Sequence, residues 1–105
     1  SQLIEYNKVK RPYLGIGGIE LDEKTAKANN LTVGIYVKTL EDFSAAEKAG
    51  IKVGDVIVKA EGQDVETMDE LNAIKNAKEI GDEMTLTVWR DGETEDITVT
   101  LQEQP

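Results

Sequence analysis

The sequence predicts an α+β domain or a small, partly open barrel or sandwich, with five to six short strands capped by two to three short helices. Three observations carry this prediction. Two capping boxes mark the beginnings of helices, an alternating apolar pattern folds back at an Asp-Gly pair, and strands and helices follow one another in mixed order instead of as βαβ units. With 105 residues, the chain is long enough for one core that needs no disulfide or structural metal.

Two strands and one helix are expected in the first forty residues. Residues 13–21 alternate apolar with small or polar side chains, and three glycines weaken this strand and indicate the close approach of another backbone. Asp22 is a suitable N-cap for a short helix that reaches Asn29. The β-branched and aromatic residues 33–40 predict the second strand.

A capping box opens the next helix. Ser44 has a glutamate three residues later, and Gly50 stands where a left-handed cap ends a helix over residues 44–49. A Gly-Asp turn at 54–55 then leads into residues 56–60, a nearly continuous apolar strand.

A second capping box, formed by Thr67 and Glu70, opens a helix that ends at about residue 77. Its apolar face has the three-and-four spacing of Met68, Leu71 and Ile74. Beyond it, residues 84–89 and 97–101 alternate around Asp91-Gly92, a pair typical of a type I′ hairpin turn.

Composition excludes several classes of function. The 12 basic residues face 21 acidic ones, and the resulting formal charge of −9 repels nucleic acid. The chain has neither histidine nor cysteine, which removes the side chains of most transition-metal sites and the commonest general base and thiol nucleophile. No apolar run approaches the roughly 20 residues that span a bilayer. We therefore expect no cofactor, no metal and no partnership with nucleic acid.

Three patterns that suggest chemistry have simpler interpretations. The glycines at 15, 17 and 18 do not complete a dinucleotide loop, because Glu20 occupies the last glycine position. Ser44 and Lys48 lie one helical turn apart as a nucleophile and base would, but Ser44 is better explained as an N-cap. The carboxylates around residues 41–42 and 91–96 lie in turns and are typical of a solvated surface.

The remaining candidate is a groove along a strand edge. An exposed glycine-rich edge over residues 15–19 is a liability unless something covers it, and the helix that carries Leu71 and Ile74 covers it in part. The backbone N–H groups of Leu14, Gly15 and Ile16 have the sequence character of an anion-binding nest, which suits a C-terminal carboxylate. A glycine-rich edge without a ligand is the alternative interpretation.

These residues resemble a known family. Residues 11–16, Arg-Pro-Tyr-Leu-Gly-Ile, look like the carboxylate-binding loop of the PDZ domains of HtrA/Deg serine proteases, where R-x-Y-[LI]-G-[IV] recurs. Residues 44–57 resemble the S-x-A-x-x-A-G-[LI]-x-x-G-D-x-I block of the same domains. The likeness covers residues 9–102. The order of elements also resembles the bacterial circular permutation, with the ligand-pairing strand nearest the N-terminus.

The resemblance implies a PDZ domain over residues 13–103, preceded by a linker over residues 1–12 from an upstream protease domain. It assigns carboxylate binding to the amides of Leu14, Gly15 and Ile16, and strand pairing to Ile16, Gly17, Gly18 and Ile19. The implied groove and pocket residues are Tyr13, Leu14, Ile16, Thr67, Met68, Leu71 and Ile74. Arg11 adds an electrostatic contribution. The histidine that opens this helix in many eukaryotic PDZ domains is absent, with Thr67 near its place.

The resemblance also implies a non-catalytic, peptide-binding module of a bacterial serine endopeptidase in protein quality control. Its expected partners are the C-termini of unfolded or misfolded polypeptides and the protease domain of the same parent chain. The chain begins at Ser1 without a methionine, so we expect an excised domain. Because no apolar run is long enough to span a bilayer, we expect this domain to be soluble. We also expect the isolated domain to be monomeric. The expected parent is a trimer or larger, in the periplasm or at the outer face of the cell membrane. A scaffold or regulatory domain of a C-terminal processing protease, a site-2 metalloprotease or a non-protease is the alternative.

Overall fold

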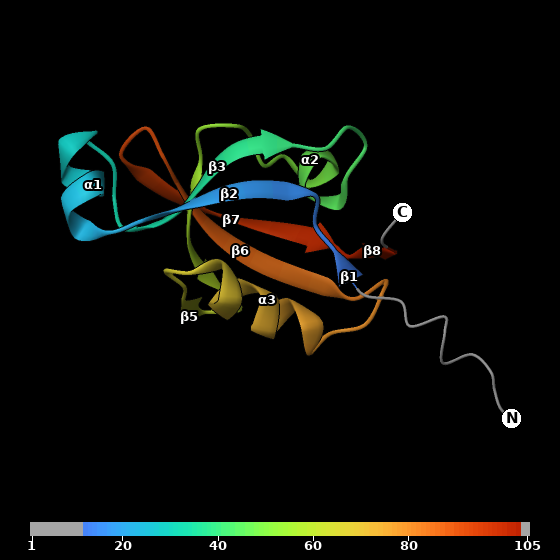
Figure 1. Ribbon diagram of the computed structural model, residues 1–105. Coiled ribbons are helices and arrows are strands. Elements are labelled where there is room, and N and C mark those ends of the chain that lie inside the picture. Colours follow the sequence, from blue (N-terminus) through green and yellow to red (C-terminus); the bar gives the residue numbers. More distant parts are fainter. Residues whose placement is uncertain (1–11, 104–105) are drawn as a thin grey trace, which may run out of the picture.

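The structure is a computed structural model that describes residues 12–103 (Figure 1). In chain order its elements are β1 (Pro12–Tyr13), β2 (Ile16–Leu21), α1 (Glu23–Ala28), β3 (Gly34–Leu40), α2 (Ala45–Ala49), β4 (Val56–Ala60), β5 (Gln63–Asp64), α3 (Met68–Asn76), β6 (Glu83–Arg90), β7 (Glu93–Thr100) and β8 (Gln102–Glu103). The expected linker lies outside the described residues except for Pro12, which pairs with Glu103.

One antiparallel sheet of six strands organises the domain. Its order is β2-β3-β4-β6-β7, and β5 pairs with β4. Within the described chain, β2 and β7 are the two ends of this order, so the sheet does not close into a barrel. The short strands β1 and β8 form a separate antiparallel pair. The expected α+β class with a partly open sheet and three helices is confirmed.

The helices begin and end where the caps predict. The side chains of Asp22, Ser44 and Thr67 each accept a hydrogen bond from a backbone N–H in the first turn of α1, α2 and α3. At Thr67 the full capping box is present, whereas the carboxylate of Glu47 in α2 accepts from Phe43 N–H. The positive φ angles of Asp91 and Gly92, +53° and +85°, fit the predicted type I′ turn.

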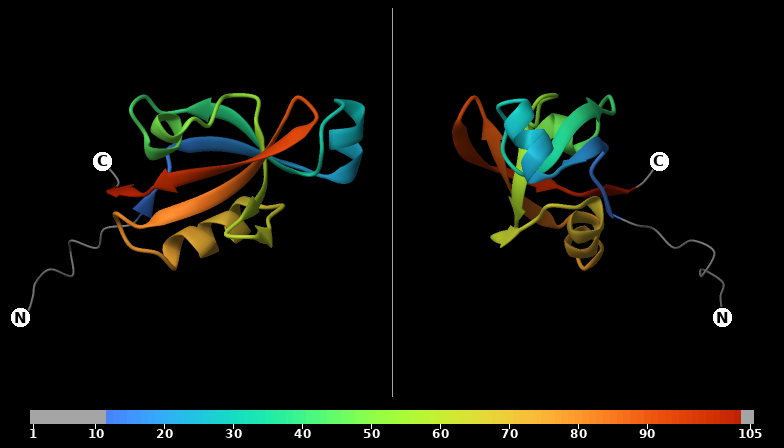
Figure 2. Two further views of the ribbon diagram at one scale, coloured as in Figure 1. Left: turned by 180° about the vertical axis from the view of Figure 1, so that it is seen from behind. Right: turned by 60° about the vertical axis from the view of Figure 1, so that its left-hand side comes forward.

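The core lies between the sheet and helices α2 and α3. Its main cluster joins alternate residues of β6, such as Met84, Leu86 and Val88, to Leu14 of the loop before β2 and Leu71 of α3. Figures 1 and 2 show α3 running along one side of β2 and β6, with α1 at the opposite end of the molecule from β1 and β8. No helix within residues 12–103 has the length and hydropathy needed to cross a membrane.

The glycines of β2 are needed for a reason other than the expected approach of a backbone. A β-carbon on Gly17 would overlap the hydroxyl of Thr39, and one on Gly18 would lie 2.6 Å from Cγ2 of Ile35. Side chains therefore fill the space beside β2. The close backbone approach occurs at Gly34 instead, where a β-carbon would lie 2.5 Å from the carbonyl oxygen of Ile57.

Candidate functional site

The loop between β1 and β2 is held in place by hydrogen bonds that its carbonyl groups accept from neighbouring backbone N–H groups. The backbone N–H of Ala46 in α2 donates to the carbonyl oxygen of Leu14 at 3.0 Å, and the N–H of Glu41 donates to that of Gly15 at 2.9 Å. Gly15 has a φ of +82°, and a β-carbon there would overlap Ser44, the N-cap of α2. The loop therefore requires glycine for both its backbone conformation and its packing.

These two carbonyl bonds fix the direction of two amide groups. All described peptide bonds are trans, and a trans peptide points its N–H opposite to the preceding carbonyl. The N–H of Gly15 therefore points away from α2, and the N–H of Ile16 points away from β3. Pairing of Glu41 with Gly15 also makes Ile16 and Leu40 a non-hydrogen-bonded pair, so both backbone polar groups of Ile16 face the free edge of the sheet.

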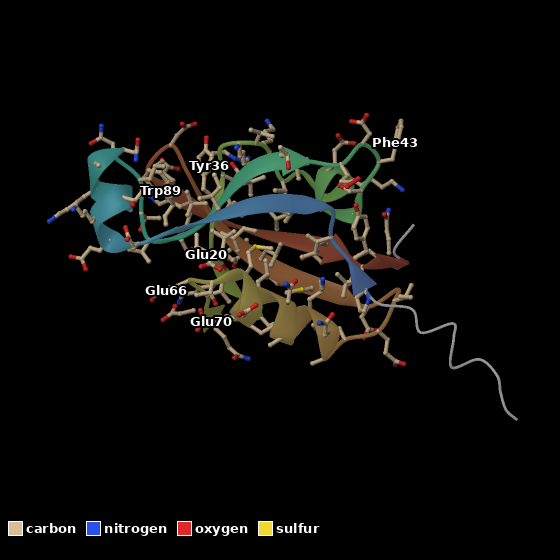
Figure 3. All side chains as sticks on the ribbon, in the orientation of Figure 1. Glu20, Tyr36, Phe43, Glu66, Glu70 and Trp89 are labelled. Atoms are coloured by element: carbon tan, nitrogen blue, oxygen red, sulfur yellow. The ribbon has the colours of Figure 1, made fainter. Side chains whose placement is uncertain are left out.

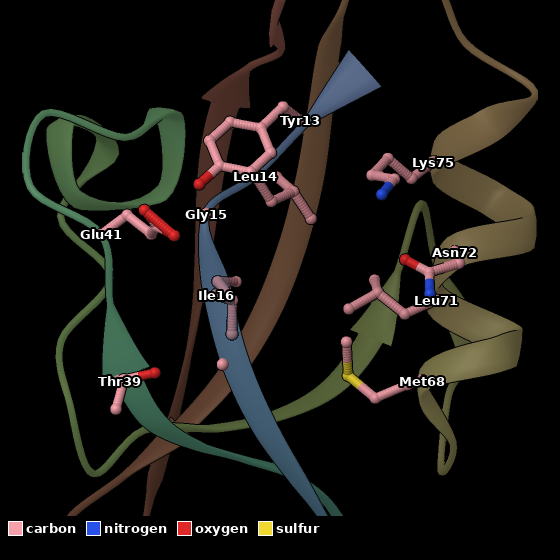
Figure 4. Close-up of a pocket in the computed structure, with 11 residues that line it drawn as sticks. Tyr13, Leu14, Gly15, Ile16, Thr39, Glu41, Met68, Leu71, Asn72 and Lys75 are labelled. Carbon is pink, nitrogen blue, oxygen red and sulfur yellow. The ribbon is translucent and has the colours of Figure 1, made fainter. Parts of the chain in front are cut away.

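A cavity of about 200 Å³ lies between this loop and α3. Figure 4 shows the loop and β2 on one side of it and the side chains of α3 on the other. Its volume is below the roughly 300–1,000 Å³ of typical small-molecule sites. The lining residues are Tyr13, Leu14, Gly15, Ile16, Gly17, Thr39, Glu41, Met68, Leu71, Asn72 and Lys75.

The cavity brings together most of the predicted site. Seven predicted residues line it, while Gly18 and the 43% exposed Ile19 continue β2 beyond it. Thr67 serves as the N-cap of α3, so the first helical residue, Met68, takes the place beside β2. Ile74 lines a different recess, beside Glu61 and Lys78 of a neighbouring surface. Arg11 lies outside the described residues.

Four lining residues were not predicted. Asn72 and Lys75 lie four positions after Met68 and Leu71, so helical spacing was a sufficient signal for them. Thr39 and Glu41 follow from the register of β3 against β2, which no local pattern in the sequence reveals.

Charged groups of both signs surround the cavity. Figure 4 shows Glu41 beside the loop and Lys75 across from it on α3. Burial of the Tyr13 hydroxyl, together with its hydrogen bond to Glu41 and the negative charge of that carboxylate, raises the pKa of Tyr13. Tyr13 therefore stays neutral at physiological pH and donates its proton toward Glu41.

The alternative chemistries find no support in the geometry. Ser44 is buried, and its Oγ accepts a hydrogen bond from the N–H of Glu47 at 3.2 Å, as an N-cap does. Lys48 is exposed. In the part of the chain that the structure describes, no three acidic side chains gather as a metal site requires.

Comparison with known proteins identifies the class. A family model of the PDZ domain matches residues 12–101, so the chain belongs to the PDZ domain family. PDZ domains are non-catalytic, and this one accounts for nearly the whole chain.

The curated relatives are HtrA/Deg-type serine proteases. The chain is 40% identical over 104 residues to the "Probable periplasmic serine protease do/HhoA-like" of Haemophilus influenzae, covering 97% of this chain and 22% of that protein. It is 38% identical over 105 residues to the periplasmic serine endoprotease DegP of Escherichia coli, covering 98% and 22%. The chain thus spans about a fifth of the length of these relatives, and the expected likeness to HtrA/Deg PDZ domains is confirmed.

Solved structures show the same fold. The HtrA-type protease AlgWS227A with a decapeptide superposes with a TM-score of 0.85 at 23% identity, over 96% of this chain and 31% of that one. The HtrA3 PDZ domain bound to a phage-derived ligand, FGRWV, gives a TM-score of 0.79 at 21% identity, over 91% and 89%.

Proposed function

We propose that this domain binds the C-terminal end of a polypeptide, with the terminal carboxylate at the loop and an apolar last side chain in the cavity. One observation carries the proposal: the N–H groups of Gly15 and Ile16 point away from α2 and β3, beside a cavity whose lining includes the apolar side chains of Leu14, Met68 and Leu71. Backbone N–H donors stabilise a carboxylate by charge-assisted hydrogen bonds. The predicted third donor, Leu14, belongs to the same turn.

The free edge of β2 supplies the second part of the site. Ile16 turns both its backbone polar groups outward, and β2 ends the order of the sheet. An extended peptide that adds to such an edge gains main-chain hydrogen bonds, and a pocket at one end gives specificity. In this arrangement Leu14, Met68 and Leu71 contact the last side chain.

Two structural neighbours support this assignment by their ligands. The ligand of the HtrA3 PDZ domain, FGRWV, ends in an apolar residue, and AlgW is solved with a tripeptide and with a decapeptide. We extend peptide binding from those proteins to this chain because the fold is shared.

The relatives support a role in a larger protein. We propose that the domain, over residues 13–103, recognises substrate or activator polypeptides for an HtrA/Deg-like serine protease and regulates it. The description of two relatives as periplasmic supports a parent outside the cytoplasm. Residues 1–12 then serve as the linker to the protease domain, and exposed C-termini of misfolded proteins are the ligands.

Fluorescence anisotropy on one labelled peptide, with a free or an amidated C-terminus, tests the proposal. We expect the free acid with a final Val, Leu, Ile or Phe to bind with a Kd of roughly micromolar order, about −8 kcal/mol. The amide should bind at least tenfold more weakly, because its own N–H groups face the loop donors and leave them unsatisfied. Equal binding of the two forms would contradict the carboxylate site and favour a scaffold domain.

A further inference from the structure

A side chain of β2 connects the strand to the first turn of α3. The backbone N–H of Met68 donates to Oε2 of Glu20 at 2.9 Å. Met68 is the first residue of α3, and its N–H has no acceptor within the helix. Figure 3 shows Glu20 between β2 and the start of α3, on the same side as Glu66 and Glu70. Glu20 thus joins the two walls of the groove.

The two walls also approach closely two residues nearer the loop along β2, where Met68 lies against Gly18. A β-carbon on Gly18 would lie 3.1 Å from Sδ of Met68, a distance tighter than most packed contacts. Along β2 the cavity lining ends at Gly17, and along α3 it begins at Met68. The open part of the groove therefore covers only the half of β2 next to the loop.

The length of a bound peptide determines which of these contacts it reaches. This step rests on the proposed function, with the last residue of the peptide beside Ile16. An antiparallel partner advances by one residue for each residue of β2. The third residue from its end then lies beside Gly18, and the fifth lies beside Glu20. The side chain of Glu20 points to the face of β2 on which a side chain at residue 18 would lie.

We propose that Glu20 determines how much of a C-terminal peptide this domain reads. Its hydrogen bond to Met68 closes the groove beyond Gly18, so the last three residues of the ligand supply the binding energy. Longer peptides gain contacts along the rest of β2 only when this bond breaks, and the cost of breaking it offsets the gain. Glu20 is therefore a specificity-determining residue that lies outside the carboxylate site.

Two peptides that share their last three residues test this inference. One has three residues and the other five, both have a free C-terminus, and both are acetylated at the N-terminus so that no ammonium group reaches Glu20. The two added residues are alanines. For the unchanged protein we expect Kd values within twofold of each other. For Glu20→Ala, the longer peptide should bind about three- to tenfold more tightly than the shorter, the worth of one added main-chain hydrogen bond.

Two control variants separate closure from other effects. Glu70→Ala weakens the start of α3, because Glu70 accepts from the N–H groups of Glu66 and Thr67, but it leaves the Glu20 contact in place. Glu20→Gln removes the charge and keeps an oxygen that accepts from Met68. Both variants should show the length dependence of the unchanged protein. A gain with Glu20→Gln equal to that with Glu20→Ala would overturn the closure.

The unchanged protein provides a measurement that needs no variant. The Met68 amide hydrogen should stay protected from hydrogen exchange with the three-residue peptide, which leaves the bond to Glu20 intact. A clear preference of the unchanged protein for the five-residue peptide, of threefold or more, would overturn the inference. So would a folded Glu20→Ala variant that gains nothing from length. Failure of the proposed function has a different signature, because acid and amide forms of the three-residue peptide would then bind alike.

Discussion

Gly15 and Ser44 pack against each other so closely that the loop before β2 has no room for a side chain at residue 15. A β-carbon on Gly15 would overlap Cβ of Ser44, the residue that caps α2. The first turn of α2 also donates to this loop, from the backbone N–H of Ala46 to the carbonyl oxygen of Leu14. The short helix α2 therefore holds the loop in the conformation that directs its amides outward.

Replacing Gly15 by alanine should lower the free energy of unfolding by more than the strain of a left-handed backbone conformation alone would. Gly62 is the matched control, since its φ of +79° is close to the +82° of Gly15 and a β-carbon there would meet nothing within 4 Å. We expect Gly62→Ala to cost about 1–2 kcal/mol. Gly15→Ala should cost about 1–3 kcal/mol more through overpacking. Urea denaturation measures both free energies of unfolding, and equal losses would contradict the packing of Gly15 on Ser44.

Met68 and Ile74 provide a second matched pair on α3. Both side chains are half-buried and pack against the core, but only Met68 lines the cavity beside β2. We expect Met68→Ala to weaken binding of an apolar C-terminal peptide about three- to tenfold, because it removes part of an apolar wall. Ile74→Ala should leave the Kd within twofold. Calorimetric titration of variants with native circular dichroism decides between these expectations, and the reverse order would place the ligand on the other side of α3.

Asp55 should contribute stability that depends on pH. Both of its carboxylate oxygens accept from Arg90, at 2.7 and 2.6 Å, and Lys52 N–H donates to it at 2.9 Å. Burial raises the pKa of Asp55, but these hydrogen bonds and the nearby positive charges outweigh burial and lower it overall. The carboxylate therefore stabilises the fold above its unfolded pKa of about 3.9, and this contribution is lost as the pH falls through the lower folded pKa.

The Asp55→Asn variant measures that contribution. At pH 7 we expect it to lower the free energy of unfolding by about 2 kcal/mol, because a charged acceptor is lost from a buried site. Below pH 4 the difference from the unchanged protein should shrink. Urea denaturation at pH 7 and pH 3 tests this, and the other acidic groups cancel because both proteins contain them. A difference that grows toward low pH would contradict the lowered pKa.

Ser44 should act in stability and not in chemistry. Ser44→Ala removes the N-cap of α2 and should cost about 1 kcal/mol, whereas Lys48→Ala, one turn later on an exposed surface, should cost less than 0.5 kcal/mol. Neither variant nor the unchanged domain should hydrolyse casein. Hydrolysis that survives purification and disappears in Ser44→Ala would overturn this assignment.

Local chemistry explains why much of the fold was predictable. The capping boxes at Ser44 and Thr67 need residues only three positions apart, and the Asp91-Gly92 turn sets the register of its own hairpin. The loop before β2 was recognisable for the same reason, since its tight turn depends on Gly15 and its neighbours. Thr67 is the N-cap of α3, as its capping box predicts, and the neighbouring Met68, also named from the sequence, lines the cavity.

The sequence by itself determined the α+β class, the three helix starts, the hairpin and the loop that is proposed to bind a carboxylate, because each depends on residues a few positions apart. Only the tertiary structure decided what lies beside that loop. The contacts of Gly17 with Thr39, Gly15 with Ser44 and Glu20 with Met68 join residues 22, 29 and 48 positions apart. Such distances are set by strand register and helix packing, which no short pattern in the sequence encodes.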